Sequence, residues 1–169
     1  IAILRYAWKT LPHVSFERLL SGPGLELIYR ALADLSGQPD LGLDAPDITH
    51  RALVGHDPLC LDVIESFCTI LGTAAANLAV TQGALGGVYI GGGIVPRLGA
   101  HFDRSGFRAR FEDKGRFSDY MKAIPTYVIT AEDVTFMGAA EILRAQLQGL
   151  EGAESATILH QIQRVRASL

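Results

Sequence analysis

The stretch Gly86-Gly87-Val88-Tyr89-Ile90-Gly91-Gly92-Gly93 decides how the rest of the chain is interpreted. Residues 86–90 are β-rich and too few for a helix, and glycines bound them on both sides, so the stretch predicts a buried strand that opens into a turn. Glycine leaves no side chain to hold a ligand away from the backbone, and it adopts positive φ easily. We therefore interpret residues 91–93 as a candidate nucleotide-binding turn, with a ligand-free turn as the alternative.

The glycine run does not match the two common phosphate-binding motifs. It is not in the Gly-x-Gly-x-x-Gly register of a dinucleotide-binding fold, and it lacks the Gly-x-x-x-x-Gly-Lys-Ser/Thr pattern of a P-loop. The kind of nucleotide therefore stays open at this point.

Helical patterns precede the predicted strand. They predict helices over residues 1–12, 23–36 and 48–54, and a long helix that starts near residues 57–58. Asp47 is the candidate cap of the third helix. The small residues of 72–79 allow close approach of another element, so the long helix is expected to be central and buried. Residues 14–21 fit either an extended segment or a helix.

Further elements follow the strand. Helical periodicity restarts at Ile94 and continues irregularly to Glu112, and residues 112–116 read as a charged loop. A second strand is predicted over 127–130 and a helix over 134–147. This alternation of helices and strands indicates an α/β fold with a mostly parallel, covered sheet.

Composition limits the class of protein. The chain has 169 residues, 49% of them hydrophobic, and a net charge of −3, which is typical of one globular domain without a basic face for nucleic acid. No signal peptide and no apolar stretch of about 18 residues is evident, so no membrane association is expected. Two cysteines do not make a disulfide framework, which favours a reducing cytoplasm. Both ends lie within amphipathic patterns, so we expect the chain to be part of a longer one.

Four strings together resemble one family. They are GGVYIGGGIVPR at 86–97, HVSFERLLSGPGL at 13–25, SGFRARFEDKGRF at 105–117 and IPTYVI at 124–129. The first resembles the adenosine motif of sugar kinases with the actin and hexokinase fold, and the other three are similar to strings of the bacterial glucokinases. The resemblance covers residues 1–150, which would be the C-terminal, nucleotide-side part of such an enzyme.

The resemblance implies a fold and a set of site residues. The fold would be a ribonuclease H-like, actin-like ATPase lobe, a helix-rich α/β structure in which helices flank a mixed sheet. Gly91, Gly92 and Gly93 would lie against the adenosine of ATP, and Gly22 and Gly24 are weaker nucleotide-binding candidates. Glu17 would accept a hydrogen bond from a glucose hydroxyl, a role that suits a carboxylate. The alternative for Glu17 is a surface charge paired with Arg18 or another neighbour.

The family's catalytic motifs are absent from these residues. The Asp-x-Gly-Gly-Thr phosphate loop, the Asn-Asp pair with the general base and the Glu-Gly-Gly-His segment do not occur, and we expect them upstream of Ile1. The chain alone is therefore predicted to hold no catalytic residue and to be inactive. The parent would phosphorylate glucose with ATP, and Mg²⁺ would arrive with the nucleotide rather than bind at a protein metal site. Its N-terminal lobe would be one partner, and a homodimer stays open.

The last residues suggest a second domain. Residues 151–169 read as a linker and an amphipathic helix, which either packs on the domain or a neighbouring chain, or resembles the opening helix of an RpiR-type regulator. DNA binding would then belong to a downstream domain. Gly138-Ala139-Ala140 resembles the family's hinge motif, where small residues let two helices cross. A rival interpretation of the whole is a sugar-sensing or dimerising domain of a transcription regulator without kinase chemistry.

Overall fold

The computed structural model describes residues 1–131 and 133–148. It divides into two units, Ile1–Ile129 and the residues from Thr130 onward, and each is treated by itself. The predicted linker and terminal helix over 151–169 lie outside the described residues.

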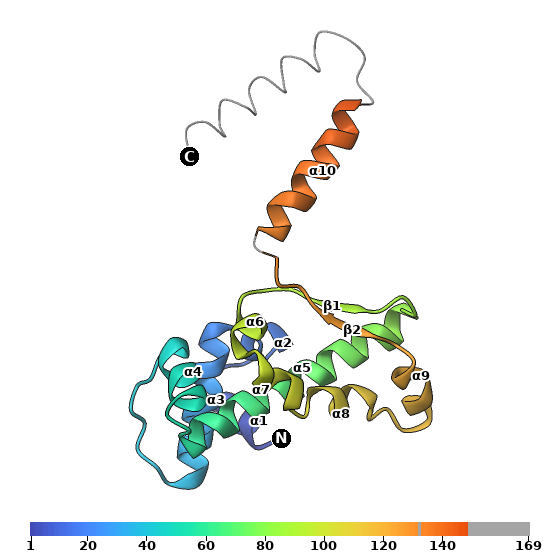
Figure 1. Ribbon diagram of the computed structural model, residues 1–169. Coiled ribbons are helices and arrows are strands. Elements are labelled where there is room, and N and C mark those ends of the chain that lie inside the picture. Colours follow the sequence, from blue (N-terminus) through green and yellow to red (C-terminus); the bar gives the residue numbers. More distant parts are fainter. Residues whose placement is uncertain (132, 149–169) are drawn as a thin grey trace, which may run out of the picture. The chain divides into compact units, whose positions relative to one another are not determined.

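Helices make up most of the first unit (Figure 1). Those before the first strand are α1 (Ala2–Ala7), α2 (Phe16–Leu19), α3 (Gly22–Ser36), α4 (Ala45–Leu53) and α5 (Pro58–Gln82). Those between the strands are α6 (Ile94–Leu98), α7 (Ala100–Arg104), α8 (Phe107–Glu112), the 3-10 helix η1 (Gly115–Phe117) and α9 (Ser118–Lys122). The irregular periodicity after residue 94 thus corresponds to several short helices.

Side-chain caps define where the helices begin. The prediction that Asp47 caps the helix over residues 48–54 is wrong. Asp44 Oδ1 accepts the backbone N–H of Asp47 at 2.8 Å, and α4 starts at Ala45. Pro46 fits this first turn, since the N–H that it lacks would have no partner inside the helix. Residues 14–21 are partly helical, and the hydroxyl of Ser15 caps α2.

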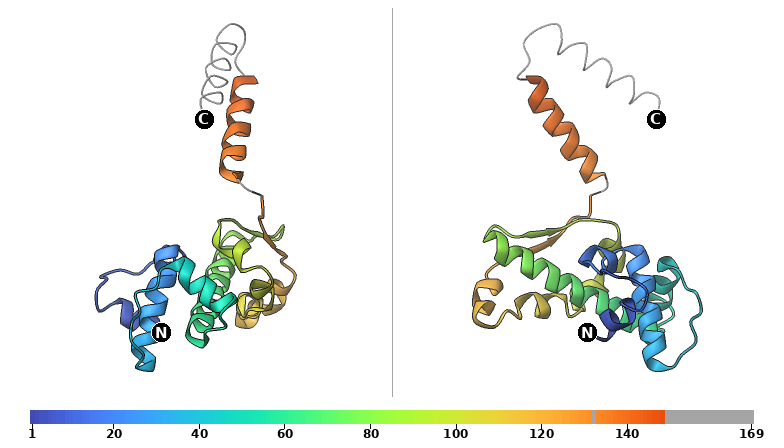
Figure 2. Two further views of the ribbon diagram at one scale, coloured as in Figure 1. Left: turned by 60° about the vertical axis from the view of Figure 1, so that its left-hand side comes forward. Right: turned by 180° about the vertical axis from the view of Figure 1, so that it is seen from behind.

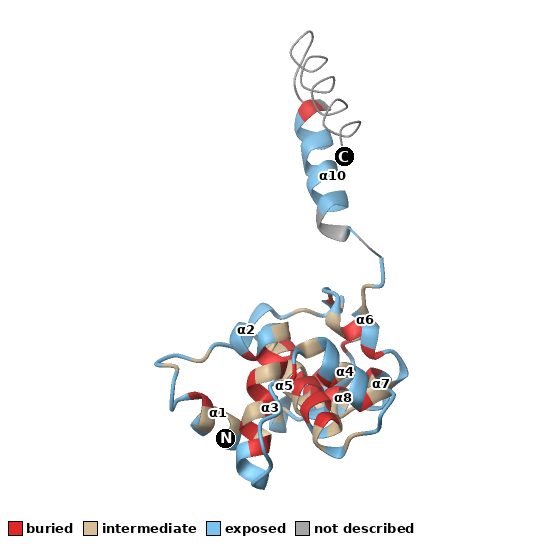
Figure 3. Ribbon diagram, turned by 90° about the vertical axis from the view of Figure 1, so that its left-hand side faces the viewer, coloured by how far each residue is buried: buried red, intermediate tan, exposed pale blue. Residues whose placement is uncertain are grey.

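The long helix α5 is the centre of the core, as predicted. Its buried residues lie among those of α3, α4 and α8 (Figure 3). Over an 18-residue window its mean hydropathy is 1.6, so by length and composition it is a candidate membrane span, contrary to expectation. The packing of its apolar positions within the first unit identifies it instead as a core helix.

Helices α5 and α8 approach each other closely at Gly72. A Cβ atom on Gly72 would lie 2.5 Å from the carbonyl oxygen of Phe107 and 3.2 Å from the Cβ of Arg110. No side chain fits at the first of these distances, so this position needs glycine. The predicted close approach to the small-residue half of α5 is confirmed, and α8 is the element that makes it.

The sheet consists of β1 (Val88–Ile90) and β2 (Thr126–Val128) in the described residues. The two strands are parallel, with Tyr89 opposite Tyr127, and they lie beside α5 (Figures 1 and 2). Parallel strands need a crossover, and the helices α6 to α9 supply it. The mixed sheet that the resemblance implies would need strands that these described residues do not include.

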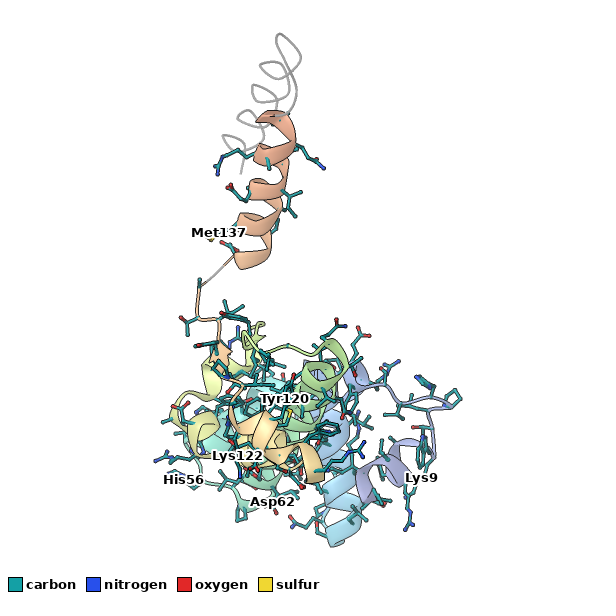
Figure 4. The ribbon with its side chains drawn as sticks, turned by 90° about the vertical axis from the view of Figure 1, so that its right-hand side faces the viewer. Lys9, His56, Asp62, Tyr120, Lys122 and Met137 are labelled. Carbon is teal, nitrogen blue, oxygen red and sulfur yellow. The ribbon has the colours of Figure 1, made fainter. Side chains whose placement is uncertain are left out.

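The second unit is described through one helix, α10 (Val134–Gln148), close to the predicted bounds. Several of its apolar side chains are exposed, among them Phe136, Met137 and Ile142; Met137 is labelled in Figure 4. Because exposed apolar side chains gain free energy when they are covered, this helix has an unfilled packing surface within the described part of its unit.

We expect Gly72→Ala to lower the free energy of unfolding by about 1–3 kcal/mol, because the new Cβ would push α8 away from α5. Chemical denaturation followed by circular dichroism measures the effect. Gly138→Ala is the matched control, since Gly138 also lies inside a helix but nothing lies within 4 Å of its Cβ position. Equal stabilities of Gly72→Ala and the wild type would contradict the close crossing.

Candidate functional site

The glycine turn leaves the carboxyl end of β1. Ile90 at the end of the strand is buried, whereas Gly91, Gly92 and Gly93 are all exposed. Gly92 has φ +107°, a conformation that favours glycine, and its Cβ position faces open space. Gly93 is the first flanking residue of α6. The prediction of a strand followed by a glycine turn is confirmed, but the prediction that the strand is buried holds only for Ile90, because Val88 is partly buried and Tyr89 is exposed.

Strand β2 holds β1 in place below this turn. The N–H of Val88 donates to the carbonyl oxygen of Pro125, and the N–H of Ile129 donates to that of Ile90, both at 2.9 Å. The start of β1 also needs glycine, because Gly87 has φ +124° and a Cβ there would lie 3.0 Å from the Tyr127 ring. The position of the turn therefore depends on the position of β2.

Arg108 fixes the segment that leads into β2. Its two terminal nitrogens donate to the carbonyl oxygens of Lys122 at 3.0 Å and Ile124 at 2.8 Å. Its Nε lies 2.6 Å from Glu112 Oε1, and its guanidinium lies 5.2 Å from the centre of the Phe111 ring. Lys122 lies on α9 (Figure 4). The side chain of Arg108 on α8 thus binds both the end of α9 and the residues that precede β2.

Two further cations, one on α8 and one in the charged segment 112–116, contact α5. Arg110 Nε donates to Thr73 Oγ1 at 3.0 Å, and Lys114 Nζ donates to Asn77 Oδ1 at 2.5 Å. The sequence predicted a charged loop over residues 112–116. In the structure this segment, together with Arg108, connects the core helix to the second strand.

The residues of the Ser-Gly-Pro-Gly turn serve the start of α3. The hydroxyl of Ser21 accepts the N–H of Gly24 at 3.2 Å, which caps the helix. Gly24 is buried, and a Cβ there would lie 2.2 Å from the carbonyl oxygen of Leu19. Packing against α2 therefore accounts for this glycine. Gly22 has only an ordinary contact, 3.8 Å from the Cβ of Ala45.

Glu17 lies in α2 with an exposed side chain. Within residues 1–131 and 133–148 no ion pair or hydrogen bond engages its carboxylate, so the described structure does not show the pairing with Arg18 that was the alternative. Figure 3 shows α2 and α6 apart from one another, and Glu17 and the glycine turn are not brought together by any described contact.

Two hollows lie away from the glycine turn. A groove of about 360 Å³ runs between α1, α2 and α5, and Ser15, Phe16 and Ser66 are among its lining residues. A smaller pocket of about 220 Å³ lies between α5 and α7 and is lined by Glu65 and Arg104, among others. Neither lining includes Glu17 or residues 91–93, although Phe16, which precedes Glu17 in the sequence, lines the larger groove.

The two cysteines are buried packing residues, as predicted. Burial raises the pKa of Cys60 to about 11, and the negative charge of Asp57 adds to it. Burial likewise raises the pKa of Cys68 to about 11. Both thiols stay protonated at neutral pH and are therefore poor nucleophiles and metal ligands. Among the described residues, no group of three His, Cys, Asp or Glu side chains is placed to hold a metal ion.

The fold agrees with that of a solved enzyme. A glucokinase from an Antarctic psychrotroph matches with a TM-score of 0.79 and 39% sequence identity, over 85% of this chain and 45% of that chain. The described structure is therefore glucokinase-like, with a small parallel sheet.

Sequence comparison gives the family. The glucokinase family model matches residues 1–146, and the chain belongs to the glucokinase family. It is 53% identical over 168 residues to a bifunctional protein glk of Burkholderia pseudomallei, which covers 99% of this chain and 26% of that protein. It is 54% identical over 140 residues to a glucokinase of Aromatoleum aromaticum, covering 83% and 42%. The chain thus spans about a quarter to two fifths of these relatives.

We expect Arg108→Ala to lower the free energy of unfolding by about 1–3 kcal/mol, because it leaves two backbone carbonyl groups without their charged donor. Arg108→Lys should recover only part of this, since one ammonium group cannot reproduce the planar fork. Thermal and chemical denaturation measure both. Arg104→Ala, an exposed arginine of α7, is the control and should change stability little. A larger loss in the control than in Arg108→Ala would contradict the role of Arg108.

Proposed function

We propose that the chain is the nucleotide-side part of an ATP-dependent glucokinase, which transfers the γ-phosphoryl group of ATP to the 6-hydroxyl of glucose. The observation that carries this proposal is the exposed glycine turn at the carboxyl end of β1, in a chain of the glucokinase family. Ligands of open α/β sheets collect at such strand ends. The catalytic aspartate and the phosphate loop would belong to an upstream segment.

The proposed nucleotide contact is made by Gly91, Gly92 and Gly93 with the adenosine of ATP. Their exposure and the open space at Gly92 support this, because a ligand can approach the bare backbone there. Gly22 remains a weaker candidate. Gly24 is the weakest, since contact with α2 already explains why it is glycine.

The proposed sugar contact is made by Glu17. An ionised carboxylate accepts hydrogen bonds from sugar hydroxyls without a donor of its own, and the side chain is exposed and free of any described partner. Mg²⁺ would be bound by the nucleotide phosphates and water, since this ion keeps several waters and uses few protein ligands. In the parent the metal would neutralise charge on the transferring phosphoryl group.

We propose that the other lobe of the parent covers the outer face of the sheet. Tyr89 is 64% exposed and Tyr127 46% exposed, and their rings stack with centroids 4.9 Å apart. Parallel sheets are normally covered on both faces, and strands of three residues are too short to be stable alone. We also propose that Gly138-Ala139-Ala140 has the hinge role of the family's motif, in which small residues let two helices cross.

The bifunctional relatives support a second domain after the kinase part. The glucokinase family match ends at residue 146, whereas the match to the bifunctional protein extends over 168 residues. We propose that residues 151–169 lead to that second domain, of the RpiR regulator type, in a cytoplasmic protein. Any DNA binding would then belong to the domain downstream.

The chain of 169 residues is expected to show no glucose phosphorylation, because it lacks the phosphate loop and the general base. A coupled assay of glucose 6-phosphate at millimolar ATP and glucose measures this. Joining the upstream part of the Aromatoleum aromaticum glucokinase to residues 1–169 should restore turnover. Activity of the chain alone, or an inactive but folded chimera, would contradict the proposed division.

In that chimera, Glu17→Gln should lower kcat/KM for glucose about tenfold or more, since a charged hydrogen-bond acceptor for the sugar is replaced by a neutral amide. The KM for ATP should stay close to that of the unsubstituted chimera. Asp103→Asn is the matched control, because Asp103 is an exposed carboxylate on α7. An unchanged kcat/KM for glucose in Glu17→Gln would remove Glu17 from the sugar site.

A further inference from the structure

The side chain of Arg97 lies beside the glycine turn. Gly93 precedes α6, and Arg97 is four residues further on, so the two positions share one face of the helix. Side chains on a helix lean toward its N-terminus, which directs Arg97 back toward the turn. The Cζ and Nη2 atoms of its guanidinium are both 4.0 Å from the position where a Cβ of Gly93 would be.

This guanidinium is available for a ligand. Arg97 is exposed, and it has no hydrogen bond, ion pair or ring contact in the part of the chain that the structure describes. Arg108 and Arg110, by contrast, are held by protein partners. A ligand at the turn would therefore not have to displace a bound carboxylate before it met Arg97.

We propose that Arg97 stacks its guanidinium on the adenine ring of the nucleotide. The inference rests on the proposed function, in which the base and sugar of the nucleotide lie against residues 91–93. A group 4.0 Å from the Cβ position of Gly93 is then next to the base rather than to the phosphates at the far end of the ligand. A guanidinium is planar and weakly hydrated, and it stacks well on aromatic faces.

The stack accounts for two features at once. Gly93 leaves the space beside the guanidinium without a side chain, and α6 places Arg97 about one turn after Gly93. Stacking depends on the size of the ring and not on the phosphates. Arg97 would thus contribute to selection of a purine nucleotide over a bare polyphosphate.

Titration of the ¹⁵N-labelled chain with adenosine and with ADP, followed by NMR, tests the proposal. The wild type should show shifts at the amides of residues 91–93 with both ligands. Arg97→Ala should weaken the binding of both by the same factor, about two- to fivefold. Arg97→Lys should recover binding only in part, because an ammonium lacks the planar surface. Arg104→Ala removes an exposed arginine of α7 and should leave both affinities unchanged.

The outcomes separate the two proposals. If the wild type binds neither ligand at millimolar concentration, the nucleotide site and the stack are both wrong. If the wild type binds both and Arg97→Ala binds them equally well, only the stack is wrong. A loss of ADP affinity with unchanged adenosine affinity, recovered by Arg97→Lys, would show a phosphate contact in place of the stack. The amide spectra of the variants confirm that each is folded.

Discussion

The close crossing of α8 over α5 at Gly72 is the constraint on which the rest of the first unit depends. A backbone carbonyl of α8 occupies the space that a side chain would need, so the two helix backbones approach as closely as only glycine permits. At that distance Arg110 and Lys114 reach Thr73 and Asn77 on α5. These polar contacts join α8 and the segment after it to α5 beside the close packing.

From α8 the same constraint reaches the glycine turn through a short series of hydrogen bonds. Arg108 holds the carbonyl groups before β2, Pro125 accepts the N–H of Val88, and β1 ends at the turn. Each of these steps is a hydrogen bond to a backbone carbonyl group, so the position of the exposed loop depends on the position of α8. A loop that is to bind a ligand without rearrangement needs such a support.

The sequence predicted the elements whose signals are local. The apolar stripe of α5, the short strand β1 and the glycine turn all follow from residue spacing. Asp44 was missed as the cap of α4 because Asp47, three residues on, fits the same pattern. The role of Arg108 could not be predicted, since its partners are main-chain carbonyls 14 and 16 residues away, which every residue type presents equally. The sequence did not single out Arg97 as a ligand-binding residue, because the argument for it rests on its distance from the Cβ position of Gly93 in the structure.

The glycines of the chain divide by a physical criterion that the sequence does not contain. At Gly24 and Gly72 an added Cβ would collide with a backbone carbonyl group, so these glycines serve packing whether or not a ligand binds. At Gly92 the Cβ position is empty and φ is positive, so nothing in the described structure except the shape of the turn requires glycine there. Exposed and unfilled space beside a fixed backbone is what a ligand site needs. The criterion therefore favours the turn over the Ser-Gly-Pro-Gly segment as the nucleotide contact.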